Sequence, residues 1–571
     1  MNSEQTPVPA ATAAPTERTV ALRRADFATL VDALEYAASA GTGASFHDGR
    51  GRLARTLTWA DIAERARAIG KALAALGLDR GTRVAIVAET DPDFIAAFFG
   101  ARYAALVPVP LPASVHLGGH EQYVQLIGRM IDHADAAVAL ASEAFLPFLQ
   151  ETERALAFTG TVAGLLAAGS GDLPSPPTAD ELAYIQYTSG STRFPRGAML
   201  TERSTLRNVL GIVRDGLQIR EGDRFCSWLP LYHDMGLVGK MIVPIASQCS
   251  IDYLGTREFA MRPRLWPRLI TDRGATISFA PPFGYELTSR RLRPGDAESY
   301  DLSRWRIAGC GADMIRPEVL ETFAEAMAPG GFDAGALMPS YGMAEVSLAV
   351  SFTPCGRGLG VDAIDGERRA LDGTIVDAPD SARFTRCGHL LPDYEVEIRD
   401  GDGAVLAERL EGTVFLRTPS TMEGYHGADE VNREILVDGW LDTGDLGYLH
   451  DGELVLTGRR KDLIIVNGRN IWPQDLEHVA ESFRGVRSGD AAAFTVDTED
   501  EPRIVLLLQC RERDDEARAG LLKEIHGELR ASFGVDPLVH PVPPHSLPKT
   551  TSGKLSRARA REAYLAGLAL D

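Results

Sequence analysis

The sequence is poor in cysteine and lacks long apolar runs, and its excess charge is negative. Its six cysteines are scattered through 571 residues without CxxC pairs or nearby His partners, so we expect reduced thiols in a cytoplasmic protein rather than disulfides or zinc. No apolar run reaches about eighteen residues and no charged-then-apolar leader opens the chain, so we expect neither a membrane span nor a secretory signal. The formal net charge of -20 argues against nucleic acid as a partner, because binding to phosphate backbones relies on an excess of Lys and Arg.

What the chain does contain is the composition of a globular enzyme, with 45% hydrophobic and 24% charged residues. Its length exceeds that of a single-core domain, so at least two domains are expected. Residues 1–20 are rich in Ala, Pro, Thr and Glu without an apolar period, which predicts a disordered tail.

Strand and helix patterns alternate from about residue 58 onward. Thr58 and Asp61 form a capping-box pattern, and apolar residues at helical spacing then continue as far as Gly77. Further apolar strands and a helix follow, at residues 84–88, 93–105, 107–109, 276–279 and 305–308. Apolar strands separated by helices indicate an α/β fold in which helices cover both faces of a parallel sheet.

The pattern changes near residue 388. Short alternating strands separated by Asp-Gly turns predict an antiparallel or barrel-like subdomain over 388–460. After Lys461 a compact α+β pattern returns, with strands and a helix at 491–496, 504–508 and 516–533. We therefore predict a large domain over residues 21–460 and a small C-terminal domain over 461–571.

A loop of small polar residues follows the apolar run at 182–187. Gly190 and Gly197 permit tight turns, so hydroxyls and backbone N–H groups between them can converge on phosphate oxygens. Taken alone, the same residues could form a polar turn between two strands. The interpretation as a phosphate-binding loop therefore depends on the rest of the chain.

Five further stretches carry chemically distinctive residues at wide separations. They are Trp228 to Leu237, Gly309 to Asp313, Tyr341 to Glu345, Trp440 to Leu446 and Leu547 to Leu555. In this order and spacing, and together with the loop at 187–197, they resemble the adenylate-forming superfamily of acyl-CoA synthetases, amino-acid adenylation domains and fatty acyl-AMP ligases. The resemblance covers nearly all of residues 21–557 and implies the fold of that superfamily, with a mobile C-terminal lid domain.

The resemblance implies a site for ATP and Mg²⁺. The phosphate loop would bind the β- and γ-phosphates through Thr188, Ser189, Gly190, Ser191, Thr192, Arg193 and Arg196. The adenine and the rest of the nucleotide would lie against Gly311, Ala312, Asp313, Tyr341, Gly342, Met343 and Ala344. Glu345 would hold Mg²⁺, which needs few carboxylates when phosphate oxygens and water complete its coordination.

The same resemblance assigns the remaining roles. Asp445 would bind the ribose hydroxyls, Arg459 would approach the ribose and α-phosphate, and Lys461 would be the hinge. Lys554 would bridge the substrate carboxylate and the α-phosphate, and His233 would lie near that carboxylate. Considered singly, these residues have ordinary alternatives: a turn aspartate, an exposed lysine and a buried structural histidine.

Three features favour the fatty acyl-AMP ligases within this superfamily. Arg193 and Arg196 stand where the commonest form has Gly and Lys, which keeps the positive charge but changes its geometry. The sequence His-Asp-Met-Gly-Leu at His233 is similar to the form found in these ligases, so Asp234 is not interpreted as a ligand for a substrate amine. The Gly- and Asp-rich segment 353–384 resembles their typical insertion, although a long loop can also lack a function.

The resemblance therefore implies that the protein activates a fatty acid with ATP to acyl-AMP and releases pyrophosphate. It would then pass the acyl group to the phosphopantetheine thiol of an acyl carrier protein, in polyketide, non-ribosomal peptide or lipid biosynthesis. Two alternatives stay open: a fatty acyl-CoA synthetase and an amino- or aryl-acid adenylation enzyme.

Overall fold

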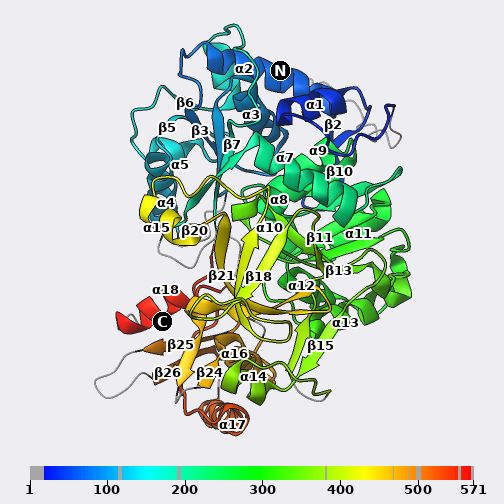
Figure 1. The fold of residues 1–571 in the computed structure, drawn as a ribbon. Coiled ribbons are helices and arrows are strands. Elements are labelled where there is room, and N and C mark those ends of the chain that lie inside the picture. The colour runs from blue at the N-terminus through cyan, green and yellow to red at the C-terminus, as the bar shows by residue number, and fades with distance from the viewer. Residues whose placement is uncertain are drawn as a thin grey trace, which may run out of the picture.

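The computed structural model describes most of the chain, namely residues 19–113, 119–188, 194–379, 382–466, 469–487, 489–496, 503–512, 514–550 and 555–567. Of the predicted tail, residues 1–18 lie outside the described residues. Thr19 is already tied to the fold, because its backbone N–H donates a 2.9 Å hydrogen bond to the Ala40 carbonyl. The N-terminal part lies at the top of Figure 1, and the C-terminal elements, coloured orange to red, lie at the bottom.

A four-stranded parallel sheet forms the first α/β unit. Its order is β4 (Val107–Leu111), β3 (Arg83–Val87), β5 (Ala136–Leu140) and β6 (Phe158–Gly160). Helices α2 (Trp59–Ala74), α3 (Pro92–Tyr103) and α4 (His120–His133) accompany this sheet. The predicted capping box of α2 is present, since the Thr58 side chain accepts a hydrogen bond from the backbone N–H of Asp61. The helix ends at Ala74, ahead of the predicted stop at Gly77.

A nine-stranded sheet forms the second α/β unit, in the order β17, β14, β13, β12, β11, β9, β10, β1, β2. In that order the bounds are His389–Leu390, Ala349–Phe352, Leu337–Gly342, Ile307–Cys310, Ile277–Ala280, Arg224–Ser227, Ser250–Leu254, Gly43–His47 and Leu53–Thr58. The strands from β13 to β1 run parallel to their neighbours, whereas β14, β17 and β2 are antiparallel additions at the edges.

Helices cover this second sheet. The longer ones are α1 (Leu30–Ala38), α7 (Glu202–Gly211), α11 (Leu265–Arg273), α12 (Pro282–Arg291) and α13 (Pro317–Met327). Shorter ones are α8 (Asp234–Leu237), α9 (Val243–Ala246) and α10 (Thr256–Met261). By contrast, α5 (Leu146–Gln150) and α6 (Val162–Ala168) contact β6 of the first sheet, and α15 (Asp429–Ile435) contacts the strands at 436–437 and 440–450. Every residue of β9, β11 and β12 is buried, as expected for strands covered on both faces. The predicted α/β fold is confirmed.

The phosphate loop joins two antiparallel strands, β7 (Leu182–Tyr187) and β8 (Gly197–Thr201), in which Tyr187 is paired with Gly197. Strand β7 also packs against β4 of the first sheet. The loop therefore begins and ends beside the first α/β unit, although residues 189–193 themselves lie outside the described residues.

An antiparallel sheet follows, as the Asp-Gly turns predict. Strands β18 (Glu395–Arg399), β19 (Gly412–Arg417) and β21 (Trp440–His450) are neighbours, and β20 (Leu436–Val437) and β22 (Glu453–Arg459) both pair with β21. The segment predicted as an insertion has secondary structure of its own: β15 (Val361–Ile364), α14 (Gly366–Asp372) and β16 (Ala382–Thr385).

The C-terminal elements follow a 3-10 turn at Arg460–Asp462. They comprise the pair β23 (Ile464–Val466) and β24 (Arg469–Ile471), the sheet β25 (Ala491–Val496), β26 (Arg503–Gln509) and β27 (Leu538–Val542), and the helices α16 (Pro473–Glu481), α17 (Asp515–Phe533) and α18 (Arg557–Leu565). From Ile464 onward the buried apolar side chains form clusters separate from the main core. In the described part of the chain, no helix is long and apolar enough to cross a membrane.

Candidate active site

Two adjoining cavities lie in this fold. The inner cavity, of about 580 Å³, is polar at one end, where its lining includes Thr188, Arg196, Glu345, Tyr425, Asp442, Arg459 and Lys461. Its other end is aromatic, with Trp228, Phe259, Phe279, Phe283 and Phe352. The interdomain cavity, of about 1060 Å³, lies between the large domain and the C-terminal elements. Phe283, Tyr341 and Arg459 line both, so the two spaces adjoin.

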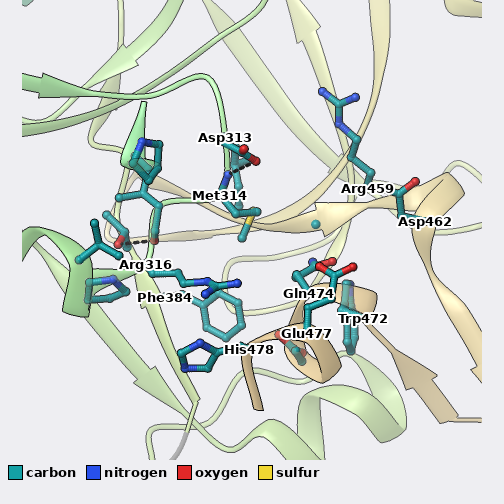
Figure 2. Close-up of a pocket in the computed structure, with 18 of the residues that line it drawn as sticks. Asp313, Met314, Arg316, Phe384, Arg459, Asp462, Trp472, Gln474, Glu477 and His478 are labelled. Carbon is teal, nitrogen blue, oxygen red and sulfur yellow. Dashed lines mark hydrogen bonds between the residues drawn. The ribbon is translucent and has the colours of Figure 1, made fainter. Parts of the chain in front are cut away.

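Figure 2 shows the interdomain cavity. Asp313 of the large domain lies at the top of the view, Glu477 and His478 of α16 lie below it, and the Arg316 side chain lies between Asp313 and His478. Arg316 also makes an ion pair with Glu481 at 2.8 Å, which joins the large domain to α16. The cavity is therefore closed partly by charged contacts between the two domains.

The described ends of the phosphate loop face the inner cavity. The backbone N–H of Thr188 donates a 2.8 Å hydrogen bond to the Arg196 carbonyl, which closes the base of the loop. The Arg196 guanidinium lies 5.4 Å from the centroid of the Tyr425 ring and lines the polar end of the cavity. The other predicted phosphate ligands, Ser189, Gly190, Ser191, Thr192 and Arg193, lie outside the described residues.

Glu345 is held in the polar end by a residue that the sequence patterns do not mark. The hydroxyl of Tyr425 donates a short hydrogen bond to its Oε1. Burial raises the pKa of Glu345, while the bond from Tyr425 and the charge of Arg459 lower it. Tyr425 pairs with Ala198 of β8 across an isolated bridge, so it also touches the strand that leaves the phosphate loop. Glu345 and Tyr425 are 80 residues apart, and no local motif connects them.

Tyr341 and Arg459 hold the predicted ribose ligand. The Tyr341 hydroxyl donates a 2.6 Å hydrogen bond to Asp445, and the Arg459 Nε lies 3.2 Å from the same carboxylate. The sequence predicts that Tyr341 packs near the adenine, and in the structure its hydroxyl also holds the Asp445 carboxylate. Gly342 follows as the last residue of β13, where an added Cβ would lie 1.9 Å from the Leu348 carbonyl oxygen, so only glycine fits. Met343 and Ala344 line the inner cavity as well.

The small-residue turn after β12 lies beside these residues. Gly311 and Ala312 line the inner cavity, whereas Asp313 lines the interdomain cavity. The Asp313 carboxylate accepts a 2.9 Å hydrogen bond from the Met314 N–H. Of this predicted group, Gly311 and Ala312 therefore share the inner cavity with Tyr341, and Asp313 stands outside it.

His233 is part of the lining of the inner cavity. It lies immediately before α8, with its ring centroid 4.8 Å from that of Tyr232. The carboxylate of Asp234 accepts a 2.7 Å hydrogen bond from the Met235 N–H of its own helix. The structure thus places His233, Glu345 and Arg459 in the lining of one cavity.

The predicted hinge and C-terminal motif also reach this region. Lys461 lines the inner cavity. Lys549 and Leu555 pair across an antiparallel bridge and, with Thr550, line the interdomain cavity. Lys554 lies outside the described residues, but the residues described on both sides of it belong to the same cavity as Arg459 and Asp445.

Comparison with known proteins identifies the family. Residues 37–426 match the family described as AMP-binding enzyme. A protein of Caulobacter vibrioides named "Putative acyl-CoA synthetase" is 45% identical over 561 residues, which are 97% of this chain and 98% of that protein. The medium-chain-fatty-acid--[acyl-carrier-protein] ligase JamA of Moorena producens is 31% identical over 578 residues, 96% of each chain. A solved structure from a study of fatty acyl-adenylate ligases of E. coli and L. pneumophila has a TM-score of 0.91 and 43% identity, and covers 96% of this chain and 100% of that chain. This chain therefore belongs to the AMP-binding enzyme family, within the group that contains the fatty acyl-AMP ligases.

Proposed function

We propose that this enzyme converts a fatty acid and ATP to acyl-AMP and pyrophosphate, and then transfers the acyl group to the phosphopantetheine thiol of an acyl carrier protein. The carboxylate oxygen forms a bond to the α-phosphorus as the bond from that phosphorus to the bridging oxygen of pyrophosphate breaks. A carboxylate is ionised at neutral pH and is itself the nucleophile, so no general base is needed. The two-ended inner cavity supports this reaction, because cations and an aromatic pocket adjoin within one space.

Each end of the cavity has a part in this scheme. Arg196 and Arg459 at the polar end, together with Lys554, neutralise the charges of the phosphates and of the approaching carboxylate. Asp445, held by Tyr341, accepts hydrogen bonds from the ribose. The acyl chain lies among the aromatic side chains of the opposite end, where burial of apolar surface provides its binding free energy. His233 lines the same cavity and orients the carboxylate.

Glu345 fits the role of a Mg²⁺ ligand in this scheme. Its carboxylate faces the same polar end as the phosphate loop and has one oxygen fixed by Tyr425. Among the described residues, no group of three or more His, Cys, Asp or Glu side chains is arranged to hold a metal. Mg²⁺ suits such a site, because it keeps several waters and binds phosphate oxygens with few protein ligands. When bound, it would offset the phosphate charge that repels an incoming carboxylate.

The preference for a carrier protein over CoA rests on the insertion at 353–384. Arg369 of α14 is buried, and its guanidinium lies 3.5 Å from the ring centroid of Trp472, at the start of α16. The same side chain donates to Glu411 at 2.9 Å, next to β19 of the antiparallel sheet. Through Arg369, the insertion therefore contacts both the C-terminal domain and the antiparallel sheet.

The insertion is also anchored at its first strand. Asp362 of β15 is buried and accepts hydrogen bonds from the Tyr448 hydroxyl at 2.7 Å and from Arg409 at 3.1 Å, and His450 lies 2.9 Å away. Three partners on one buried carboxylate make this end of the insertion rigid. The insertion is thus fixed at β15 and contacts the C-terminal domain at α14.

This arrangement supports a preference for a large acyl acceptor, the carrier protein, over the smaller CoA. Moving the C-terminal domain away from α14 costs free energy, and a ligand can shift that equilibrium only by binding the moved state more tightly. A folded carrier protein can supply this difference through a protein interface, whereas CoA has a much smaller contact surface. The name of the Caulobacter relative makes acyl-CoA synthesis the competing function.

The deciding experiment compares the two acceptors directly. The enzyme is supplied with ATP, Mg²⁺ and a fatty acid, and either CoA or a phosphopantetheinylated acyl carrier protein, and the thioester products are quantified. We expect pyrophosphate release and acyl-carrier-protein formation, without steady acyl-CoA turnover. Sustained acyl-CoA synthesis would refute the proposed acceptor, and the absence of pyrophosphate release would refute adenylation itself.

We further propose that the enzyme works in a reducing compartment such as the cytoplasm. All six cysteines are free thiols, and five of them are buried. Unpaired thiols are typical of proteins that stay in reducing surroundings.

A further inference from the structure

Five side chains that have no part in the proposed chemistry surround the two ends of the phosphate loop, and we call them the aromatic box: Arg129, His133, Tyr187, Phe194 and His426. Arg129 and His133 lie one turn apart on α4, so their side chains project from the same side of that helix. Phe194 is the first described residue after the loop segment 189–193. The Arg129 guanidinium lies 4.6 Å from its ring centroid, and the His133 ring centroid lies 5.3 Å away.

The other end of the loop enters the same box. Tyr187 closes β7 just before the loop, and its hydroxyl lies 2.9 Å from His133 Nδ1. The hydroxyl donates its proton to the Met130 carbonyl of α4 at 3.2 Å. The ring of Tyr187 meets the ring of Phe194 edge-on, with 6.2 Å between centroids. The residues on both sides of the loop are therefore packed against one helix.

His426 is the fifth residue of the aromatic box and lies next to the start of β8. Its ring centroid lies 5.8 Å from that of His133, and its backbone N–H donates a 2.8 Å hydrogen bond to the carbonyl of Gly197, the first residue of β8. Burial, followed by the charge of His426, lowers the pKa of His133. A neutral imidazole can pack against the neighbouring rings without repelling Arg129.

Through these contacts α4 can affect the inner cavity without lining it. Among the described residues, none from α4 lines either cavity. Thr188 directly follows Tyr187, Arg196 lies two residues after Phe194, and both Thr188 and Arg196 line the inner cavity. We propose that Arg129 and His133 are positioning residues that hold Thr188 and Arg196, the described ends of the triphosphate loop, in place by packing against Tyr187 and Phe194. This inference rests on the proposed ATP-dependent function and adds the first α/β unit to the determinants of ATP affinity.

The test is a double-mutant cycle on Arg129 and Phe194. The variants are Arg129→Ala, Phe194→Leu and the two combined, because Leu keeps the apolar bulk and removes the aromatic face. Gln122→Ala is the control, an exposed residue two turns earlier on the same helix. ATP binding is measured by titration calorimetry with Mg²⁺ and without fatty acid, and KM is measured separately for ATP and for the fatty acid.

We expect Arg129→Ala to weaken ATP binding about two- to fivefold, the size of an exposed cation–π contact. KM for the fatty acid should not change, since neither Arg129 nor Phe194 lines the inner cavity. In the Phe194→Leu background the loss from Arg129→Ala should disappear, because the partner ring is gone. Gln122→Ala should bind ATP like the native enzyme.

Three results would overturn the inference: unchanged ATP affinity in both single variants, additive effects in the double variant, or an equal rise in KM for both substrates. If Phe194→Leu does not fold, as judged by thermal unfolding, the exposed Arg129→Ala variant still decides between an effect on ATP alone and no effect. Failure of the native enzyme to bind ATP at all would instead count against the proposed function. The two hypotheses therefore fail in distinguishable ways.

Discussion

Replacing Tyr425 with Phe removes a single oxygen atom that donates to Glu345, and leaves the ring under Arg196 in place. A hydrogen bond to a charged group contributes about 1.5–3 kcal/mol, so its loss corresponds to a factor of about 10 to 150 in an equilibrium constant. In this variant Glu345 loses the partner that fixes its orientation. We therefore expect the Mg²⁺ concentration that half-saturates ATP-dependent pyrophosphate release to rise within that range.

The cavity contains a matched control, because Tyr341 makes the same kind of bond to Asp445 at 2.6 Å. Tyr341→Phe should impair recognition of the ribose, which is measured as a smaller preference for ATP over 2′-deoxy-ATP, and should leave the Mg²⁺ dependence unchanged. Calorimetric binding of Mg²⁺ and ATP without fatty acid separates binding from turnover in both variants. If the two variants shift the Mg²⁺ dependence equally, or if neither does, Tyr425 does not position Glu345 and our reasoning is wrong.

Four other changes test separate parts of the molecule. Arg369→Ala removes the guanidinium between Glu411 and Trp472; it should destabilise the protein by about 3–5 kcal/mol in denaturant unfolding, because Glu411 stays buried without its partner. If the insertion excludes CoA, the same variant should gain acyl-CoA turnover, and a folded variant without that gain would contradict the role of the insertion. Lys554→Ala should abolish adenylate formation while ATP binding persists, so unchanged pyrophosphate release would refute its assigned role. Phe259→Ala opens the wall where this ring stacks on Trp228 at 3.7 Å, and should shift the preference toward longer fatty acids in a chain-length series; an unchanged preference would place the end of the acyl chain elsewhere. Burial raises the pKa of Glu481 to about 7, so the folded state holds its proton more tightly than the unfolded state, and stability is lost as pH rises from about 4.5 to 7. Glu481→Gln should lack this loss, and parallel melting curves of both proteins over that pH range would contradict the shift.

Local signals predict much of the fold because they act between residues close in sequence. The capping box at Thr58 marks the start of α2 since its two side chains bond to backbone groups within one turn. The Asp-Gly turns mark the antiparallel sheet in the same way. Local signals do not predict the contacts of the segment 353–384. Its Gly-rich composition indicates an insertion, but the burial of Arg369 depends on Trp472 and Glu411, which lie far along the chain.

In the candidate site, too, some residues are predicted by local motifs and others are recognised only from their contacts in the fold. Glu345, Asp445 and Arg459 are predicted from sequence because each stands in a stretch that resembles a family motif. Tyr425 is not, since its role comes from a bridge to Ala198 and a hydrogen bond to Glu345 that exist only after folding. The contact of Phe194 with α4 is hidden for the same reason.

The contacts of Asp445 also indicate how nucleotide binding would rearrange the site. Its carboxylate is shared by the Tyr341 hydroxyl and by the Arg459 guanidinium, and the charge of Asp445 raises the pKa of Arg459. Ribose hydroxyls that donate to Asp445 compete with Arg459 for the same oxygens, whereas the α-phosphate offers that guanidinium a new anionic partner. Since Arg459 lines both cavities, its transfer from carboxylate to phosphate would couple recognition of the sugar to neutralisation of the reacting phosphate. ATP would thus complete its own site, and the arginine would reach the α-phosphate only once the ribose is in place.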